Sequence, residues 1–514
     1  MVGLRRQLTT LDLVILGIAG SIGTGVLFAV AGMAALAGPG MVIGWIVGAV
    51  LFLFIALTYV DLSARYPEAG GPARYSLYTH GRTTNMINAV SSLIWYLFIP
   101  PIEALGATEG LNFFYPHFIN VHGDPTTLGA IVAAVIMLAF LPFNYFGIKA
   151  FAKTTTPLGI VKLTLYLLVA LGFLGFAHFA NFTAFGGVMP FGLGGVFAAV
   201  PLAMFAYGSI RVLPDYAEEV KQPQALRRAI LWSVGGQTFI YLMFAVAFIA
   251  GLSWSAAKVH PGAWTALSSL PGNPFLVLSQ DSNVGWLIGI TVVIAVLGPF
   301  VSGYIYQGAG SRVLLAMGRS GYVSQQMKDL SERYAVPQWS LLVFTGVGII
   351  VAYIAAPLPN IYSLITDGVV AGYIAYAVNP VSMLVVHRQS NSKPRMGRSV
   401  LAAVAIASAS LIIYWSGWPS VPYAVIILGV MSLAFGVVYK VKEGLLNSLW
   451  YIAYIGFLVL MTWVGSVGAQ RVVSVDMGSV IVVALSMAVF LPWGVASRLP
   501  QLEGAGISGV EGHA

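Results

Sequence analysis

Residues 17–28 read G-I-A-G-S-I-G-T-G-V-L-F, a run rich in glycine, serine and threonine inside an apolar stretch of membrane-spanning length. Backbone groups in a bilayer core must find hydrogen-bond partners, so irregular backbone is tolerated only where it is buried or lines a polar cavity. The run therefore predicts a broken helix whose free peptide groups bind a solute. A close-packed helix face is the alternative, because Gly17, Ser21 and Gly25 recur at every fourth position.

The composition of the whole chain places this segment in a membrane protein. Of its 514 residues, 58% are hydrophobic and only 8% are charged, whereas roughly 25% are charged in a typical soluble domain. A water-soluble fold is excluded, and we assign the net charge of +8 to membrane topology rather than to nucleic-acid binding. The chain has no cysteine, and its histidines show no metal-ligand spacing, so we expect neither a metal nor a cofactor.

Hydropathy predicts an all-α integral membrane protein with about fourteen spans, each of the roughly 20 residues that a bilayer requires. They lie near residues 11–38, 40–64, 84–114, 127–146, 156–178, 192–214, 228–252, 284–312, 338–356, 360–386, 400–416, 421–439, 447–466 and 477–496. With the N-terminus inside, only Lys258 and Arg471 among the basic loop residues fall outside. This asymmetry is typical of a multi-pass cell-membrane protein with a cytoplasmic N-terminus.

Two cations, Lys162 and Arg211, fall inside the predicted spans. An intramembrane cation is costly and normally faces the bundle interior, where it pairs with an acid or with backbone carbonyls. Burial makes a lysine able to trade a proton, so Lys162 is a candidate coupling residue. Arg211 lies one helical turn before Asp215, so a structural ion pair is the alternative to a charge in the binding pocket.

Acidic residues at membrane depth are equally rare. Glu103 and Glu109 lie in the third predicted span. For Glu103 we keep four interpretations open: a partner of Arg211, a proton site, an anchor for a substrate amine, or a structural pair that holds the third helix to the sixth. Asp367, in the tenth span, binds substrate, pairs with Lys162, or caps a helix break beside Gly368.

Residues 204–209, M-F-A-Y-G-S, predict a second interruption in the sixth span. Paired interruptions five spans apart are typical of inverted-repeat transporters, whose solute binds near the midplane between half-helices. The amides at a half-helix N-terminus attract an anionic group, and unwound carbonyls attract a cation. Two adjacent interruptions therefore suit a small zwitterion such as an α-amino acid.

Several separate stretches carry a family likeness. They are residues 20–28, Y-P-E-A-G-G-P-A-R-Y (66–75), F-A-Y-G-S-I (205–210), A-E-E-V-K-Q-P (217–223) with R-R-A-I (227–230), and S-R-V-L-L-A-M-G-R-S-G (311–321). In these motifs the chain resembles the amino acid–polyamine–organocation transporters across its first ten helices. The resemblance implies a five-plus-five inverted-repeat fold, as in LeuT, with alternating access.

The resemblance also implies a function and a division of the chain. We expect a sodium-independent secondary transporter of amino acids, working by proton coupling (symport) or by exchange (antiport), with a polyamine exchanger as the alternative within the same fold. The implied segments are a cytoplasmic N-terminus (1–10), a first repeat (11–190), a second repeat (191–388), four additional helices (389–498) and a disordered cytoplasmic tail (499–514). The loops 66–75 and 217–223 are either an inner gate or hairpin turns.

The family resemblance also assigns roles to individual residues of the site. The first-helix motif implies that the substrate carboxylate meets backbone amides and a hydroxyl of Ser21, Ile22, Gly23, Thr24 and Gly25. The sixth-helix motif implies that the ammonium group meets carbonyls of Phe205, Ala206, Tyr207 and Gly208. Either Phe205 or Tyr207 is expected to close over the substrate, although core packing is the alternative for both rings.

The charged residues either follow or break the family pattern. Lys162 matches a lysine that, in sodium-independent relatives, stands where sodium-coupled ones bind sodium, and its charge would repel that ion. Arg211 departs from the pattern, since many relatives carry an acid there, and this reversal disfavours cationic substrates.

Two other classes of protein fit the sequence less well. An ion channel would need a tandem filter motif or a symmetric ring of charges, and an intramembrane enzyme would need paired acids, a catalytic triad or a metal cluster. The sequence offers neither pattern. We expect a transporter, not an enzyme, in contact with lipid and with its amino acid and proton, and either a monomer or a homodimer.

Overall fold

The computed structural model describes residues 3–121, 123–270, 272–282, 284–356, 368–389, 396–466 and 468–499, apart from the side chains of Pro223 and Gln389. Asp367 and the tail 500–514 lie outside the described residues. Throughout the described part the chain is built from helices, and its β-structure consists of isolated bridges. The all-α membrane class predicted from hydropathy is confirmed.

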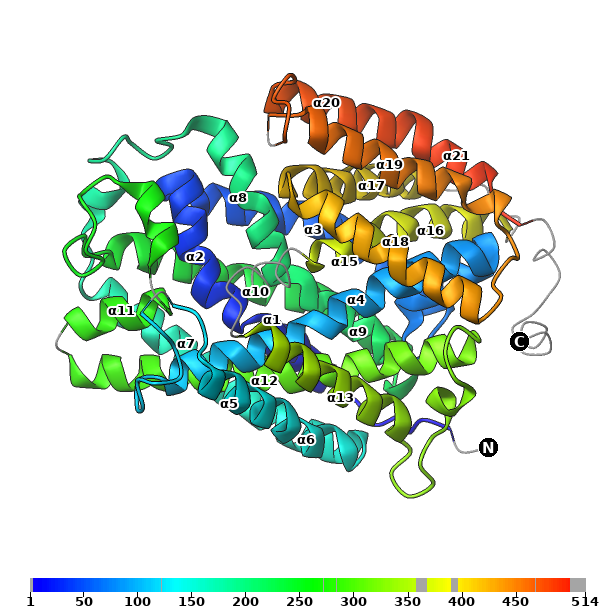
Figure 1. Cartoon of the computed structure of the whole chain (residues 1–514), viewed down its shortest axis with the longest axis horizontal. Coiled ribbons are helices and arrows are strands. Elements are labelled where there is room, and N and C mark those ends of the chain that lie inside the picture. The colour runs from blue at the N-terminus through cyan, green and yellow to red at the C-terminus, as the bar shows by residue number, and fades with distance from the viewer. Residues whose placement is uncertain are drawn as a thin grey trace.

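The helices follow the predicted order along the chain (Figure 1). The first five spans contain α1 (Thr10–Ser21), α2 (Thr24–Ala37), α3 (Met41–Arg65), α4 (Leu77–Leu111), α5 (Thr127–Ala139), α6 (Leu141–Tyr145) and α7 (Ile148–Leu174). The next five spans and one short connecting helix are α8 (Gly192–Tyr207), the 3-10 helix η4 (Gly208–Arg211), α9 (Val212–Asp215), α10 (Pro223–Gly251), α11 (Pro274–Asp281), α12 (Gly285–Arg319), α13 (Gln338–Ala355), α15 (Val370–Ile374) and α16 (Val378–Gln389). The last four spans are α17 (Met396–Ser416), α18 (Ser420–Val438), α19 (Leu449–Val464) and α20 with α21 (Val475–Leu485, Leu491–Ala496).

Thirteen helical stretches among the described residues are long and apolar enough to cross a membrane. The first of them, Thr24–Arg65, is 42 residues long, about twice the length that one crossing needs. It joins α2 to α3 through the 3-10 turn Gly38–Gly40. Because α1 and α2 together form one interrupted span and α3 forms the next, the structure matches the fourteen predicted spans.

The helices that surround the interior pack in two groups (Figure 1). One group contains α1, α2, α3, α8 and α10, which pack extensively on one another. The other contains α4, α5, α12 and α13, with the long pair α4 and α12 at its centre. Helix α7 touches both groups, through α1 and α10 on one side and α12 on the other.

Glycines on α4 allow the close approach at the centre of the second group. A Cβ on Gly110 would lie 2.7 Å from the backbone of Ala295 on α12, so only a hydrogen fits there. One turn earlier, a Cβ on Gly106 would collide with the methyl group of Thr24 on α2. Helix α4 is therefore seated against α12 and against the start of α2 at once, which places its side chains next to the predicted site.

The last four spans lie on the outside of the ten-span core. Helix α17 packs on α3, α8 and α16, and α18 packs on α4 and α15. The outward face of α18 is apolar, and its side chains are 63–77% exposed at Ile426, Val430, Leu433 and Val437. A stripe of this kind at helical spacing, turned away from the protein, suits contact with lipid chains.

We expect Gly110→Ala to lower the melting temperature of the purified protein, because overpacking a close helix contact costs about 1–3 kcal/mol. Gly289→Ala is the matched control, since a Cβ at that position on α12 meets nothing within 4 Å. The control should melt at the wild-type temperature or slightly above it, because alanine favours a helix by about 0.5–1 kcal/mol over glycine. Equal melting of the two variants would contradict the proposed closeness of α4 and α12.

Candidate functional site

The first membrane span breaks at Ile22 and Gly23. Helix α1 ends at Ser21, and the backbone leaves helical geometry at Ile22 (φ −89°, ψ 75°) and at Gly23 (φ −122°, ψ −137°) before α2 begins at Thr24. The residues Ser21 to Gly25 are all buried. The structure therefore has the interruption that residues 17–28 predict, and it lies inside the protein rather than at the lipid boundary.

A carboxylate from α4 lies at this break. The backbone N–H of Thr24, the first residue of α2, donates to Oε2 of Glu103 at 3.0 Å. A Cβ on Gly23 would collide with both carboxylate oxygens. The Glu103 side chain is only 3% exposed. The N-terminal end of α2 thus already holds one anionic group, and this group comes from the protein itself.

The side chain of Lys162, on α7, links α1 to α12 near the break. Its Nζ donates to the carbonyl oxygen of Ala19 on α1 at 2.7 Å, to that of Gly298 on α12 at 2.6 Å, and to the hydroxyl of Ser302 at 2.9 Å. These acceptors use all three of its N–H groups. The side chain is fully buried, and within the described part of the chain no carboxylate forms an ion pair with it. Backbone carbonyls, one of the two partner types expected from the sequence, therefore hold this ammonium group.

The sixth span changes its winding at Gly208 instead of unwinding. Helix α8 ends at Tyr207 and continues as η4, and the backbone stays in the right-handed helical region at Tyr207 (φ −73°, ψ −11°) and Gly208 (φ −58°, ψ −20°). The second predicted interruption is therefore a tighter turn, because the N–H of Gly208 bonds back to the carbonyl of Phe205. A 3-10 segment in the middle of a helix often marks a functional hinge or a strained sequence.

Side chains hold the two interruptions together. The hydroxyl of Tyr241 on α10 lies within hydrogen-bond distance of the carbonyl oxygens of Ser21, at 3.1 Å, and Ala206, at 2.7 Å. The hydroxyl of Ser209 donates to the carbonyl of Gly17 at 2.7 Å and also contacts the hydroxyl of Ser21. The two stretches that the sequence singled out as one site are thus neighbours in the fold.

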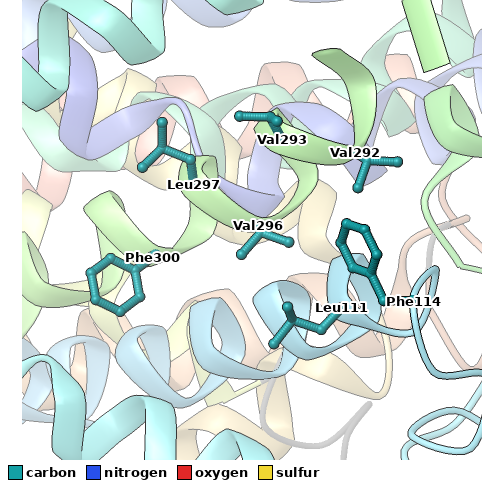
Figure 2. A pocket seen from close by; sticks show the side chains of 7 residues that line it. All are labelled: Leu111, Phe114, Val292, Val293, Val296, Leu297 and Phe300. Atoms are coloured by element: carbon teal, nitrogen blue, oxygen red, sulfur yellow. The ribbon is translucent and has the colours of Figure 1, made fainter. Parts of the chain in front are cut away.

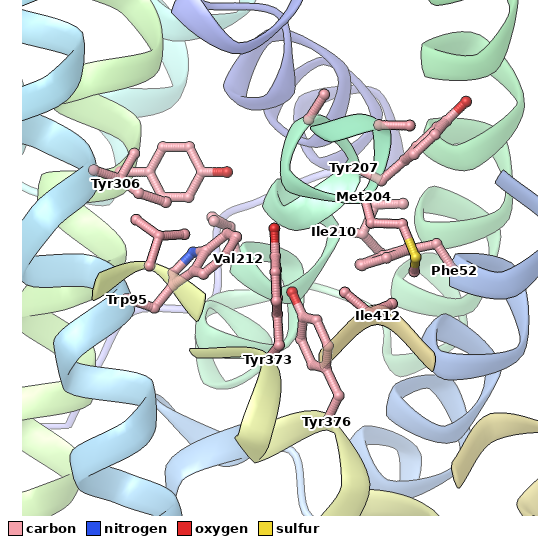
Figure 3. Packing of buried hydrophobic residues seen from close by; sticks show 14 of the residues in the cluster. Phe52, Trp95, Met204, Tyr207, Ile210, Val212, Tyr306, Tyr373, Tyr376 and Ile412 are labelled. Carbon is pink, nitrogen blue, oxygen red and sulfur yellow. The ribbon is translucent and has the colours of Figure 1, made fainter. Parts of the chain in front are cut away.

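The two candidate aromatic residues of the sixth span point in different directions. The ring of Phe205 lies 3.3 Å from where a Cβ on Gly25 would stand. The hydroxyl of Tyr207 instead contacts Thr238 on α10 at 3.2 Å, and its ring packs among the side chains of α3 and α10. Figure 3 shows Tyr207 on the far side of this segment from Trp95. Phe205, and not Tyr207, therefore faces the break.

Aromatic rings surround the buried guanidinium of Arg211. Its Cζ lies 5.4 Å from the ring centres of Trp95, Tyr96 and Tyr376. Its two terminal nitrogens donate to the hydroxyl of Ser92 at 2.9 Å and to the carbonyl of Gly372 at 3.3 Å. Figure 3 shows Trp95 and Tyr376 converging on the segment of the sixth span that carries Ile210 and Val212. Ring faces attract a cation, most strongly where water is excluded.

The ion pair considered for Arg211 is absent from the described part of the chain. Asp215 accepts a hydrogen bond from the hydroxyl of Tyr96 instead, and Glu103 is engaged with the amide of Thr24. Both pairings considered from the sequence are therefore wrong for this conformation. The physical reason is that rings and neutral acceptors from α4, from α15 and from the 3-10 turn Ala375–Ala377 surround the guanidinium, so neither carboxylate forms an ion pair with it.

Several residues that shape the site were not singled out from the sequence. They include Trp95, Tyr241, Ser302, Tyr376 and Gln237. One pair did carry a signal, since Gln237 and Tyr241 are four residues apart on an apolar span and therefore share a helix face. The amide of Gln237 donates to the carbonyl of Gly17 at 2.9 Å, so this polar face supplies donors to α1 near its broken end.

Ion pairs link the loops 66–75 and 217–223 to the end of α12, and we name them the closing cluster. Its members are Glu68, Arg74, Glu218, Glu219, Arg312 and Arg319. The guanidinium of Arg312 holds Glu219 through two hydrogen bonds, one of them 2.8 Å long, and Arg319 holds Glu218 at 2.6 Å. The N–H of Ala69 donates to Glu218 at 3.0 Å, so the loops 66–75 and 217–223 are in direct contact.

Burial and charge act in opposite directions within the closing cluster. Burial raises the pKa of Glu219 against the opposing charge of Arg312, and it raises the pKa of Glu68 against that of Arg74. For Glu218 burial also opposes ionisation, but the hydrogen bond and charge of Arg319 outweigh it and hold the pKa below its usual value. Each carboxylate of the cluster therefore depends on its arginine to stay charged.

An apolar hollow of about 310 Å³ lies apart from the break (Figure 2). Its lining residues are Leu111, Phe114, Val292, Val293, Val296, Leu297 and Phe300, from the end of α4 and from α12. All of these side chains are apolar, so they cannot satisfy the charged groups of an amino acid. The polar groups suited to a zwitterion lie at the break.

A many-span helical membrane protein with a broken first helix and buried interior charges belongs to the class of solute transporters. More particularly, the chain belongs to the amino acid permease family, whose model matches residues 8–425. This confirms the family likeness found in the sequence motifs, and it identifies the chain as an amino acid transporter and not an enzyme.

Individual relatives are similar along almost their whole length. The chain is 26% identical to the aspartate-proton symporter of Bacillus subtilis (strain 168), over 97% of each protein. It is 27% identical to the glutamate/serine transporter AimA of the same strain, over 96% of this chain and 94% of that protein. It is 25% identical to the branched-chain amino acid permease BcaP, also of that strain, over 87% of this chain and 95% of that protein.

We expect Glu219→Gln to loosen the closing cluster, because removing one partner leaves the buried charge of Arg312 uncompensated, at a cost of about 3–5 kcal/mol. The chain has no cysteine, so Ala69→Cys, at a fully buried position in the loop 66–75, gives a single reporter. Maleimide should label this cysteine severalfold faster in the Glu219→Gln background. Glu332→Gln, which changes an exposed carboxylate, is the control, and equal labelling in both backgrounds would contradict a closing role.

Proposed function

We propose that this protein is a proton-coupled, sodium-independent transporter of neutral and acidic amino acids in the cell membrane, with its N-terminus in the cytoplasm. Membership of the amino acid permease family supports the substrate class. Its similarity to an aspartate-proton symporter and to a glutamate/serine transporter supports proton coupling and these side-chain types. The concentration of basic loop residues on one side of the predicted topology supports the orientation.

One observation carries the proposal: donors and acceptors for both poles of an amino acid lie side by side at the break. The N-terminal end of α2 suits a carboxylate because of the helix dipole, and the N–H of Thr24 already binds one, that of Glu103. The carbonyls of Ser21 and Ala206, held together by Tyr241, suit an ammonium group. Phe205 stands beside Gly25, in place to cover the bound substrate.

Lys162 links the proton to movement of the bundle. Its ammonium group ties Ala19, in the group of α1, α2, α3, α8 and α10, to Gly298, in the group of α4, α5, α12 and α13. Losing the proton removes a positive charge and one donor, which weakens this tie. Gain and loss of this proton therefore alter how firmly the first group is held to the second, and rocking of one group against the other exposes the site to each side in turn. By the family resemblance, the same ammonium group stands where sodium-coupled relatives bind sodium, and its positive charge would repel that ion.

The positive charge of Arg211 disfavours cationic substrates. It lies on the sixth span only a few residues beyond Phe205 and Ala206, and Trp95 contacts both Arg211 and Phe205. Like charges repel strongly in a water-poor interior. A polyamine carries at least two positive charges, so we consider a polyamine exchanger less well supported than an amino acid transporter.

The test is uptake into proteoliposomes that contain the purified protein, with aspartate, serine and putrescine as labelled solutes. An imposed inward proton gradient without sodium should drive aspartate or serine above its external concentration, and an uncoupler should abolish the accumulation. A channel cannot accumulate an unmodified solute against its gradient. Accumulation of putrescine alone, or a strict requirement for sodium, would overturn the proposal.

We expect Lys162→Ala to abolish pH-dependent uptake while substrate binding stays measurable, because the variant loses the tie between the two helix groups and keeps the peptide groups of the break. Lys153→Ala is the matched control, since Lys153 lies on the same helix with its side chain exposed. Initial uptake rates over a pH series distinguish the two. A normal pH profile in Lys162→Ala would remove Lys162 from the coupling role.

We expect Gly25→Leu to weaken amino acid binding by about tenfold or more, equivalent to about 1.4 kcal/mol. The added side chain would fill the space between α2 and the Phe205 ring, where even a Cβ has only 3.3 Å. Gly235→Leu is the control, because a Cβ at that position on α10 meets nothing within 4 Å. Titration calorimetry on both folded variants measures the effect, and undiminished affinity in Gly25→Leu would move the site elsewhere.

A further inference from the structure

We propose that Glu103 is a tethered carboxylate that occupies the place of the substrate carboxylate at the start of α2, and that a proton must bind to Glu103 before an amino acid can take this place. The inference rests on the proposed function, and it explains how amino acid binding at the break depends on a proton.

The contact of Glu103 with α2 is of the kind that a substrate carboxylate would make. Its Oε2 accepts the N–H of Thr24 at 3.0 Å, and both oxygens lie so close to Gly23 that a Cβ there would collide with them. A carboxylate at a helix N-terminus gains from the free N–H groups and from the dipole of the helix. Two carboxylates cannot use the same amide at once, so Glu103 and the substrate compete.

A second observation points to an anionic ligand at the same place. The hydroxyl of Thr24 is buried close to the Glu103 carboxylate but makes no well-formed hydrogen bond in this conformation. A buried hydroxyl without a good partner is costly. Glu103 thus satisfies this hydroxyl poorly, and a free carboxylate can take the amide and the hydroxyl together. The site is better matched to a mobile ligand than to the tethered side chain.

The backbone around Glu103 fixes its position. Gly106, one turn further along α4, lies where any Cβ would collide with the Thr24 methyl group. Helix α4 therefore lies directly against the first turn of α2, and the Glu103 side chain has only a short distance to reach the amide. Because the side chain is 3% exposed, its carboxylate depends on protein groups rather than water for its stabilisation.

The charges around Glu103 leave it free to exchange a proton. The titratable groups that act on its carboxylate are Lys162 and Tyr166 on α7 and Tyr306 on α12. Lys162 is engaged with carbonyls and a hydroxyl, and no cation of the described residues forms an ion pair with Glu103. The amide of α2 and the field of Lys162 are thus the main stabilisers of the charged form.

The coupling follows from this competition. When Glu103 takes up a proton, the charge-assisted hydrogen bond to Thr24 becomes a neutral and weaker one, and the amide becomes available to the substrate. One proton is bound as one amino acid binds. When the amino acid leaves on the other side of the membrane, Glu103 releases the proton and returns to the amide. Proton and substrate therefore move in the same direction.

The test measures the affinity of the purified protein for aspartate and serine by titration calorimetry over a pH series. Wild-type affinity should rise as the pH falls. Glu103→Gln, which is neutral at every pH, should bind at all pH values as tightly as the wild type does in acid, about tenfold or more tighter than the wild type at alkaline pH. Glu109→Gln changes a half-buried carboxyl on the same helix, one of whose oxygens is buried and makes no hydrogen bond, so it is the matched control and should behave as the wild type.

A second variant and a spectroscopic measurement keep the test independent of how well Glu103→Gln folds. Glu103→Asp keeps the charge but is one carbon shorter, so it should lose its hold on Thr24 and bind tightly at alkaline pH. Infrared difference spectra should show the band of a protonated carboxyl group when serine is added to the wild type or to Glu109→Gln. Serine amide, which lacks the carboxylate, should not produce the band.

The possible results separate the inference from the function on which it rests. An unchanged pH dependence in Glu103→Gln, with proton-driven uptake intact, overturns the tethered carboxylate and leaves the transporter. Weaker binding of Glu103→Gln at every pH overturns it in favour of an anchor for the substrate amine. Absence of aspartate and serine binding by the wild type at every pH overturns both proposals.

Discussion

Where the first helix stops inside an apolar protein, its peptide groups must find hydrogen-bond partners within the protein, and much of the surrounding structure follows from that constraint. Carbonyls at the end of α1 accept from Ser209, Gln237, Tyr241 and Lys162. The first amide of α2 donates to Glu103. Four other helical segments thus supply polar side chains to one short stretch, which explains why an otherwise hydrophobic interior contains so many of them.

Three interior cations are stabilised in three different ways. Lys162 is surrounded by backbone carbonyls and a hydroxyl, Arg211 by aromatic rings, and Arg312 by the carboxylate of Glu219. Carbonyl contacts can be given up one by one, which suits a group that changes its proton. A guanidinium that binds a carboxylate through two hydrogen bonds has a fixed geometry, which suits the closing cluster. The type of partner therefore follows the mechanical role that we propose for each cation.

The sequence was informative where the backbone itself carries the signal. Glycines and hydroxyl residues at 20–25 cannot sustain an ordinary span, so the break was predictable, and an isolated Lys162 had to face the interior. Side-chain directions were not predictable, because they depend on packing between distant segments. Phe205 and Tyr207 are two residues apart, yet only the contacts of Tyr207 with α3 and α10 show that it turns away from the break. The neutral surroundings of Arg211 come from α4 and α15, far away in the sequence.

The environment of Arg211 has a bioenergetic consequence. A transporter that admits protons with its substrate dissipates the membrane potential if protons also cross alone. In the conformation described here, a guanidinium ringed by Trp95, Tyr96 and Tyr376 stands beyond the substrate site, with no carboxylate of the described residues paired to it. A fixed positive charge beside the proposed substrate site repels hydronium and alkali ions, so on the function proposed above Arg211 opposes their leak through the empty carrier.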